Sequence, residues 1–193
     1  MSVEETGAQG DTMKVVGICG SPRKGNTEWM LSKLLEQVAE KGVETQLILL
    51  REKRIKGCDG CLSCEAGGPK RQGTCHIQDD MQQIYPALMA ADGFALGTPV
   101  YFDMLSGLLK NFMDRTCPIW PHLESKPVVG LAVAEAGIGQ AVANLKAYAG
   151  ICSMRWSGQV TALAKLPREA AKDPELEPTL ERLAGRLVRA LRA

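Results

Sequence analysis

Aromatic residues are scarce in this sequence, neither sign of charge is in excess, and long apolar runs are missing. Aromatic side chains make up 5% of the 193 residues, and 23 Lys and Arg against 22 Asp and Glu leave a formal net charge of +1. Because no broad positive field attracts a polyanion, we expect no nucleic-acid partner. The strongly apolar stretches, such as Pro127–Ala134, are far shorter than the roughly 20 residues of a membrane-spanning helix, so we expect no membrane partner.

The first twelve residues, MSVEETGAQGDT, also lack the basic start and apolar stretch of a signal peptide. We therefore expect residues 1–12 to form a flexible tail on a cytoplasmic protein. The remaining residues, 13–193, are enough for one domain with its own core, since a chain of this length buries roughly 70% of the surface that its unfolded form exposes. Residues 51–80 interrupt this domain with a cysteine-rich insertion.

Apolar runs typical of buried strands alternate with segments of helical periodicity along the rest of the chain. The predicted strands are Met13–Cys19, Thr45–Leu50, Gly93–Thr98, Lys126–Ala134 and Met154–Ala164. Helices are predicted around 27–40, 81–88, 105–112, 138–145 and 176–191, the second of them capped by Asp79 or Asp80. Parallel strands separated by helices need right-handed crossovers. The sequence therefore predicts an α/β fold with a three-layer, doubly wound, five-stranded parallel sheet.

The loop after the first strand, Gly20–Thr27 (GSPRKGNT), leads directly into the first predicted helix, and we call it the anion loop. Backbone N–H groups and the dipole at a helix N-terminus favour an anion there. The candidate binding residues are Ser21, Arg23, Gly25, Asn26 and Thr27. The loop is neither a G-x-G-x-x-G motif nor a Walker motif, which needs Lys in place of Asn26, so a nucleotide triphosphatase is disfavoured. A plain helix cap made by Asn26 or Thr27 is the alternative.

Two further loops leave the sheet at the same edge, where doubly wound folds bind their ligands. Thr98–Gly107 (TPVYFDMLSG) follows the third strand, and Glu135–Gln140 (EAGIGQ) follows the fourth. Both lie where a planar cofactor ring would be held. Ordinary packing at a helix start is the alternative for Tyr101 and Phe102.

Four of the seven cysteines are crowded into one segment. Cys58, Cys61 and Cys64 form a C-x2-C-x2-C run that brings three thiolates around one centre, and Cys75 supplies a fourth. Without an export signal, such crowding indicates metal or redox chemistry rather than a disulfide scaffold. Zinc held by the four thiolates, or by three of them and His76, is an alternative to an iron-sulfur cluster. The cysteines predicted to be buried small apolar residues are Cys19, Cys117 and Cys152.

Together, GSPRKGNT, TPVYFDMLSGLLKNFMDR and the cysteine segment resemble, in order and spacing, the NADPH-dependent FMN reductase and iron-sulfur flavoprotein family, which has the flavodoxin-like fold. The resemblance covers about Met13 to Gly158 and implies that FMN is the cofactor. The residues implied to hold the FMN phosphate are Ser21, Arg23, Asn26 and Thr27. Those implied to lie along the ring and the ribityl chain are Pro99, Val100, Tyr101, Phe102, Ala136 and Gly137.

The same resemblance implies a [4Fe-4S] cluster held by Cys58, Cys61, Cys64 and Cys75. The ten residues that separate Cys64 from Cys75 are a longer gap than in the compact motif of that family. The resemblance also implies a homodimer or homotetramer in which the cluster of one subunit faces the flavin of its neighbour. The basic residues around the segment are Arg51, Lys53, Arg54, Lys56, Lys70 and Arg71. They offset the charge of the cluster or form a solvated face; the alternative is a docking patch for ferredoxin.

We therefore expect an FMN-dependent oxidoreductase that passes electrons from a reduced carrier, through a [4Fe-4S] cluster and FMN, to a small acceptor. No catalytic side chain is expected, because the flavin performs the chemistry. One alternative is a cluster-free FMN or quinone reductase with NAD(P)H as its electron donor. The other is a zinc-stabilised, flavodoxin-like binding module without turnover.

Overall fold

The computed structural model describes residues 12–65 and 75–193. The predicted flexible tail, apart from Thr12, lies outside the described residues, and so does the middle of the cysteine-rich insertion with Lys70 and Arg71. Within the described ranges, no helix combines the length and the apolarity needed to cross a lipid bilayer.

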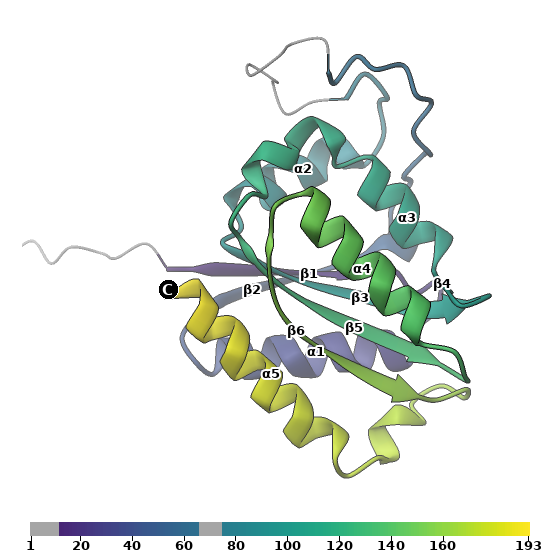
Figure 1. Ribbon diagram of the computed structural model, residues 1–193, viewed down its shortest axis with the longest axis vertical. Coiled ribbons are helices and arrows are strands. Elements are labelled where there is room, and N and C mark those ends of the chain that lie inside the picture. The colour runs from purple at the N-terminus through teal and green to yellow at the C-terminus, as the bar shows by residue number, and fades with distance from the viewer. Residues whose placement is uncertain (1–11, 66–74) are drawn as a thin grey trace, which may run out of the picture.

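Five parallel strands form the central sheet (Figure 1). They are β1 (Lys14–Cys19), β2 (Glu44–Leu49), β3 (Gly93–Tyr101), β5 (Pro127–Ala134) and β6 (Arg155–Leu163), in the order β2-β1-β3-β5-β6. The chain order reverses between β1 and β3, so the carboxyl ends of these strands border the crevice where such folds bind ligands. The predicted doubly wound sheet with five parallel strands is confirmed.

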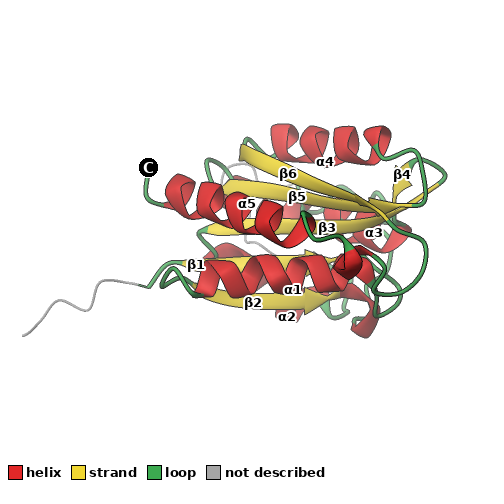
Figure 2. Cartoon of the chain, turned by 90° about the horizontal axis from the view of Figure 1, so that it is seen from below, coloured by secondary structure: helices red, strands yellow, loops and turns green. Residues whose placement is uncertain are grey.

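Helices cover both faces of the sheet and make three layers (Figure 1 and Figure 2). On one face lie α1 (Asn26–Ala39) and α5 (Leu176–Leu191); on the other lie α2 (Met81–Ala90), α3 (Gly107–Asp114) and α4 (Gly139–Ile151). Short 3-10 helices in the connections are η1 (Leu50–Glu52), η3 (Cys117–His122) and η4 (Ala170–Lys172). Because both faces are covered, every residue of β5 is buried, as in a central parallel strand.

β3 continues past its predicted end at Thr98, because a short strand, β4 (Met104–Leu105), pairs antiparallel with its last residues. The two turn residues, Phe102 and Asp103, have φ angles of 50° and 61°. Positive φ at both positions is the geometry of the two-residue hairpin turn that suits twisted strands. Part of the predicted loop is therefore the end of a strand, and the resulting hairpin projects from the edge of the sheet (Figure 1).

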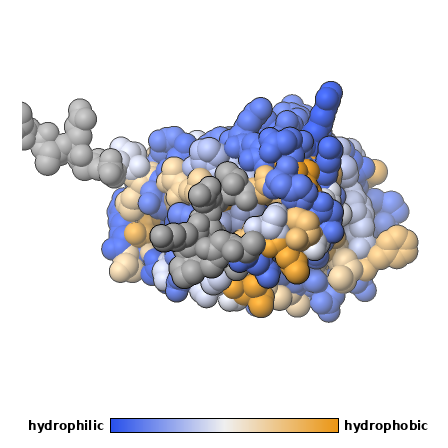
Figure 3. All heavy atoms as spheres, turned by 90° about the horizontal axis from the view of Figure 1, so that it is seen from above, coloured by the Kyte–Doolittle hydropathy of each residue, from blue (hydrophilic) through white to orange (hydrophobic). Residues whose placement is uncertain are grey.

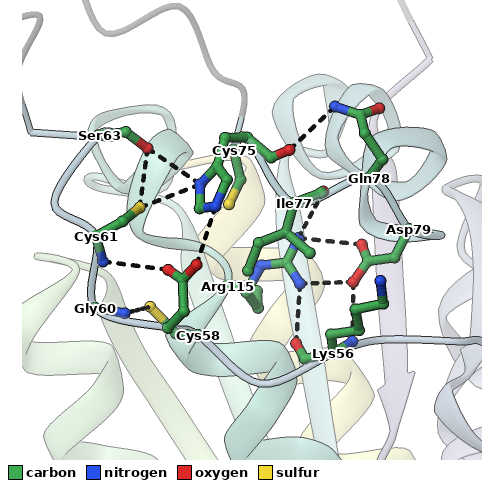
Figure 4. Close-up of polar contacts among 12 residues, drawn as sticks. Lys56, Cys58, Gly60, Cys61, Ser63, Cys75, Ile77, Gln78, Asp79 and Arg115 are labelled. Atoms are coloured by element: carbon green, nitrogen blue, oxygen red, sulfur yellow. Dashed lines mark hydrogen bonds and ion pairs between the residues drawn. The ribbon is translucent and has the colours of Figure 1, made fainter.

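A buried ion pair fastens the cysteine-rich insertion to the end of α3 (Figure 4). The side chains of Arg115 and Asp79 are 1% and 3% exposed, and Arg115 Nη1 lies 2.6 Å from Asp79 Oδ2. The same guanidinium donates to the backbone carbonyls of Lys56, at 2.9 Å, and Ile77, at 3.3 Å. Tyr85 in α2 donates its hydroxyl to the Arg115 carbonyl at 2.7 Å. One side chain thus holds the chain on both sides of the cysteines.

Asp79 also marks the start of α2. Its Oδ1 accepts from the Met81 N–H at 3.1 Å, which is the role predicted for a cap. The carboxylate of Asp80 instead accepts from the Arg54 N–H at 2.8 Å. Burial by itself raises the pKa of Asp79, but hydrogen bonds from Arg115 and from two backbone N–H groups outweigh it and hold that pKa below its usual value. The carboxylate is therefore ionised in the folded protein at neutral pH.

Replacing Asp79 with Asn is expected to destabilise the protein by about 3–5 kcal/mol at pH 7, because the buried Arg115 charge loses its partner. Since the folded-state pKa of Asp79 is lowered, its contribution is complete above the unfolded-state pKa of about 3.9 and is lost as the pH falls through the folded-state pKa. The difference in unfolding free energy between wild type and variant should therefore narrow below about pH 4. Urea unfolding, monitored by circular dichroism at several pH values, measures the unfolding free energy of each protein.

Asp114→Asn is the matched control, because Asp114 pairs with Lys110 on the exposed surface of α3 at 2.6 Å. Exposed pairs of this spacing contribute about 0.3–0.5 kcal/mol. If the Asp79→Asn and Asp114→Asn proteins were equally stable at pH 7, the buried pair would have no special structural role.

Candidate functional site

A cavity of about 220 Å³ opens at the carboxyl edge of the sheet, beside the switch between β1 and β3. The predicted site residues that line it are Ser21, Arg23, Asn26, Thr27, Pro99, Val100 and Tyr101. Glu135, in the predicted loop after the fourth strand, lines it too, and the lining residues that the sequence did not predict are Val133, Ala134, Ala164 and Lys165. The predicted residues that do not line it are Gly25, Phe102, Ala136 and Gly137. The loop after β1, the carboxyl ends of β3 and β5, and the residues just after β5 and β6 thus meet at one cavity.

The anion loop presents a helix N-terminus to this cavity. Gly25 occupies the N-cap position of α1, and no side chain caps it. The Ser21 hydroxyl donates to the Arg23 carbonyl at 2.7 Å and accepts from the Arg23 N–H at 3.3 Å, which holds the loop in a tight curve. Ser21, Asn26 and Thr27 are all buried. Polar groups and the positive end of α1 therefore converge on one wall of the cavity.

Asn26 does not cap α1 but joins the anion loop to a distant segment. Its Nδ2 donates to the Leu166 carbonyl at 2.8 Å, and its Oδ1 accepts from the Ala170 N–H at 3.2 Å. Arg23 Nη2 donates to the Lys165 carbonyl at 3.0 Å. These bonds fasten the connection between β6 and α5 against the anion loop. No local sequence pattern predicts these contacts, because the bonded residues lie 140 to 144 positions apart in the chain.

Ser106 holds the anion loop against α3. Its buried hydroxyl donates to the Gly20 carbonyl at 2.6 Å and, as the N-cap of α3, accepts from the Leu109 N–H at 3.2 Å. A Cβ at Gly20 would lie 2.7 Å from Leu109 Cβ, so only glycine fits this close approach. Sequence reasoning assigned Ser106 no role, although a serine directly before a helix is the usual signal of an N-cap.

The β3–β4 hairpin forms the outer rim of the site. Tyr101 is 47% exposed and lines the cavity, whereas Phe102 is fully exposed and lies outside it. Phe102 therefore does not pack at a helix start. A Cβ at Gly137, whose φ is +68°, would overlap the Asp103 carboxylate. The loops after β3 and β5 thus lie side by side, as predicted, although Ala136 and Gly137 stay outside the cavity itself.

An exposed ion pair crosses the mouth of the cavity. Lys165 Nζ lies 2.8 Å from Glu135 Oε1, and both side chains are 66% exposed. Because water screens such a pair, it contributes little to stability and separates easily. The mouth can therefore open for a ligand without disturbing the core.

The four predicted metal ligands do not converge on one point in the part of the chain that the structure describes. No three of the sulfurs of Cys58, Cys61, Cys64 and Cys75 lie within 4.8 Å of one another. Cys58 and Cys61 are exposed, whereas Cys64 and Cys75 are half-buried. All four are free thiols, so each sulfur is available to a metal.

Cys61 instead belongs to a mixed group of donors with Asp59 and His76. His76 Nδ1 lies 3.1 Å from Cys61 Sγ, and His76 Nε2 lies 3.0 Å from Asp59 Oδ2. Hydrogen bonds from the Cys61 thiol and N–H, aided by the charge of His76, lower the pKa of Asp59. Sulfur, nitrogen and carboxylate donors within 4.8 Å of one another are a set that zinc accepts.

Cys19 and Cys152 are buried, as predicted, but the prediction for Cys117 was wrong. Cys117 is half-buried at the start of η3, and its sulfur lies 3.5 Å from that of Cys64. The fold returns the end of α3 to the cysteine segment, a contact between positions 53 apart that no local pattern reports. Burial and the hydrogen bond with Cys117 raise the pKa of Cys64 to about 11.

An apolar groove of about 680 Å³ runs beside this cysteine pair. It is lined by Cys58, Cys64, Cys117 and Cys152 together with side chains of α3, η3 and α4. Figure 3 shows apolar atoms gathered among hydrophilic ones on the face of the molecule that carries the cysteine segment. The groove and the 220 Å³ cavity share no lining residue, so they are two separate sites.

The basic residues around the cysteine segment differ in their surroundings. Arg51 is paired with Glu28 at 2.7 Å and with Glu52 at 3.1 Å, so its charge is already compensated. Lys53 and Arg54 are exposed, and neither forms an ion pair with a described residue. A partner with negative charge would therefore meet Lys53 and Arg54 rather than Arg51.

Residues 13–165 match the family model of NADPH-dependent FMN reductase. An iron-sulfur flavoprotein of Methanocaldococcus jannaschii is 43% identical over 123 residues, which are 63% of this chain and 61% of that protein. An iron-sulfur flavoprotein of Methanosarcina thermophila is 38% identical over 127 residues, which are 65% of this chain and 64% of that protein. The chain thus spans less than two thirds of the length of these relatives.

Among solved structures, a flavodoxin from the domain Archaea matches with a TM-score of 0.64 at 14% identity, covering 94% of this chain and 100% of that one. At this identity the likeness shows the fold alone, and it confirms the flavodoxin-like fold that the sequence predicted. The family model extends over every strand of the sheet, including the anion loop and the β3–β4 hairpin. The chain therefore belongs to the NADPH-dependent FMN reductase family.

Proposed function

We propose that this chain binds FMN at the 220 Å³ cavity and works as a flavin-dependent oxidoreductase. The observation that carries the proposal is the uncapped N-terminus of α1, which meets Arg23 at the cavity wall. Backbone N–H groups, a helix dipole and a guanidinium together suit a phosphate group. Membership of an FMN reductase family supports FMN as the ligand that carries this phosphate.

The size of the cavity indicates which part of FMN it takes. At about 220 Å³ it is smaller than the ~300–1,000 Å³ of pockets that enclose drug-sized ligands, so we assign it to the phosphate and the ribityl chain. Pro99, Val100 and Tyr101 lead from it toward the rim. We expect Phe102 and Gly137, which lie outside the cavity, to contact the ring.

FMN supplies the electron and hydride chemistry when it is bound. The chain's own task is to hold the phosphate and to orient the ring. The titratable side chains that line the cavity are Arg23, Tyr101, Glu135 and Lys165, and all of them are exposed. A reaction carried by the cofactor fits a site without a buried acid or base.

We further propose that Cys58, Cys61, Cys64 and Cys75 hold a [4Fe-4S] cluster. Four free thiols are the donor set that such a cluster takes, and Arg115 holds the chain on both sides of them. The relatives at 43% and 38% identity are named iron-sulfur flavoproteins, which supports the assignment. Electrons then pass from a reduced carrier such as ferredoxin, through the cluster and FMN, to a small acceptor.

The separation of the two sites supports an assembly of several subunits. The cysteine groove and the FMN cavity share no lining residue. We propose a homodimer or homotetramer in which the cluster of one subunit lies near the flavin of its neighbour.

A zinc site is the second candidate for the cysteine segment. The group of Asp59, Cys61 and His76, with its donors within 4.8 Å of one another, favours it. With zinc in place of the cluster, the chain is a cluster-free FMN or quinone reductase that takes electrons from NAD(P)H.

Replacing Arg23 with Ala is expected to weaken FMN binding about tenfold and to leave riboflavin binding unchanged, because riboflavin has no phosphate. Quenching of flavin fluorescence during titration of the apoprotein measures both dissociation constants. Lys24→Ala is the matched control, since Lys24 is an adjacent exposed cation that does not line the cavity. Equal losses of FMN and riboflavin affinity in Arg23→Ala would place the phosphate elsewhere.

Anaerobically purified protein is expected to contain about four iron and four sulfide ions per chain. Assays for iron, sulfide and zinc, together with the visible spectrum, show which metal or cluster the protein contains. Cys61→Ser should lower the iron content, whereas His76→Ala should leave it unchanged. Iron near zero, with a zinc content that falls in His76→Ala, would instead establish the zinc site.

Reduced ferredoxin is expected to reduce the bound flavin faster than NADPH does, because electrons enter at the cluster. Stopped-flow absorbance of the flavin measures both rates. Reversing the charges of Lys53 and Arg54 should slow the ferredoxin reaction several-fold and weaken its dependence on salt, while the NADPH rate stays the same. Arg182→Glu, on the exposed face of α5, is the control. Rapid reduction by NADPH with none by ferredoxin would support the cluster-free reductase.

A further inference from the structure

Two thiols that lie far apart in the sequence meet beside the apolar groove. Cys64 belongs to an exposed turn, in which the Glu65 N–H donates to the Leu62 carbonyl at 2.9 Å. Cys117 begins η3, and the two sulfurs are 3.5 Å apart. A disulfide bond is about 2.05 Å long, so the sulfurs need to approach by about 1.5 Å. A change of rotamer in a cysteine side chain moves its sulfur by a distance of this order.

The two thiols are supported differently. Cys117 is followed by the buried residues Pro118 and Ile119 and is preceded by Thr116. The Thr116 hydroxyl donates to the Met113 carbonyl at 2.7 Å, which ties this position to α3. Cys64 is half-buried, and its neighbours in the turn, Ser63 and Glu65, are exposed. One thiol is therefore held in place, and the other lies on a surface segment that can adjust to it.

The remaining cysteines have other partners. Cys58 Sγ accepts from the Gly60 N–H at 3.4 Å, and Cys61 Sγ contacts His76. Cys152 lines the same groove, but it is buried. Among the described residues, Cys64 and Cys117 form the one hydrogen bond between two sulfurs.

We infer that Cys64 and Cys117 are a redox-active dithiol that a low-molecular-weight disulfide converts to an intramolecular disulfide bond. One protein thiolate attacks the small disulfide and releases one of its halves as a thiol. The second protein thiolate then attacks the mixed disulfide and releases the other half. The protein loses two electrons and two protons, and the small disulfide becomes two thiols.

The disulfide has a consequence for the metal site, and only this consequence rests on the proposed function. A cysteine ligates metal as a thiolate, so Cys64 cannot bind a cluster or zinc while it is bonded to Cys117. The proposed cluster and the disulfide therefore exclude each other. Oxidation of the metal-free chain makes Cys64 unavailable as a metal ligand, and reduction of the disulfide makes it available again.

The test is oxidation of the full chain, loaded with FMN and freed of metal, by oxidised glutathione at several ratios to reduced glutathione. After the remaining thiols are alkylated, mass spectrometry of tryptic peptides reads the crosslinks. We expect one crosslink, between the peptide that contains Cys64 and the peptide that contains Cys117, with loss of two hydrogen atoms. No crosslink at any glutathione ratio would overturn the inference.

Two variants identify the cysteines involved, because the peptide of Cys64 also carries Cys58 and Cys61. Cys64→Ser and Cys117→Ser should each abolish the crosslink, and Cys152→Ser, in the same groove, should retain it. A crosslink that persists in Cys64→Ser would show that another thiol reacts, which contradicts the inference. Far-ultraviolet circular dichroism confirms that each variant is folded.

A final measurement separates this inference from the proposed metal site. Protein that carries the proposed cluster should form the crosslink several-fold more slowly than the metal-free chain, since the cluster occupies Cys64. If the reduced protein binds neither zinc nor iron, the proposed metal site is wrong. The crosslinking test on the metal-free chain is independent of that result and decides whether Cys64 and Cys117 form a disulfide.

Discussion

The buried ion pair between Arg115 and Asp79 is the constraint on which the cysteine segment depends. Opposite charges that are 1% and 3% exposed gain little net stability from each other, because desolvation offsets much of their attraction. The role of the ion pair is instead to fix the position of the chain around it. With its further bonds to the carbonyls of Lys56 and Ile77, Arg115 fixes the chain on both sides of the cysteines, although its Nε has no partner among the described residues. The fold thus sets where the segment begins and ends.

The same anchor explains why Cys117 lies beside Cys64. Arg115 and Cys117 are two positions apart, so the bonds that hold Arg115 also hold the start of η3 against the segment. The anchor that places the proposed cluster ligands thus also brings a further thiol, Cys117, against one of them. In the two proposals, the cluster and oxidation act on one sulfur, and the 220 Å³ cavity, which shares no lining residue with the groove, is outside that competition.

Local patterns predicted the fold and one wall of the candidate site. Apolar runs and helical periodicity mark the sheet, and the anion loop is recognisable because its residues are contiguous. What the sequence did not predict depends on pairs far apart along the chain. Asn26 bonds to residues 140 and 144 positions away, Arg115 to the insertion, and Cys117 to Cys64. The end of β3 was placed too early for the same reason, because its last residues are extended only by pairing with β4.

The turn of the β3–β4 hairpin packs against the loop after β5, and the two form one continuous surface. Phe102 and Asp103 both have positive φ, a conformation that costs most residues other than glycine about 1–3 kcal/mol each. The turn nevertheless places the Asp103 carboxylate where a Cβ on Gly137 would be. The strained turn and the glycine therefore depend on each other, since a side chain at Gly137 would displace the hairpin. A ring bound between these loops would meet a single surface, whose position is set by both.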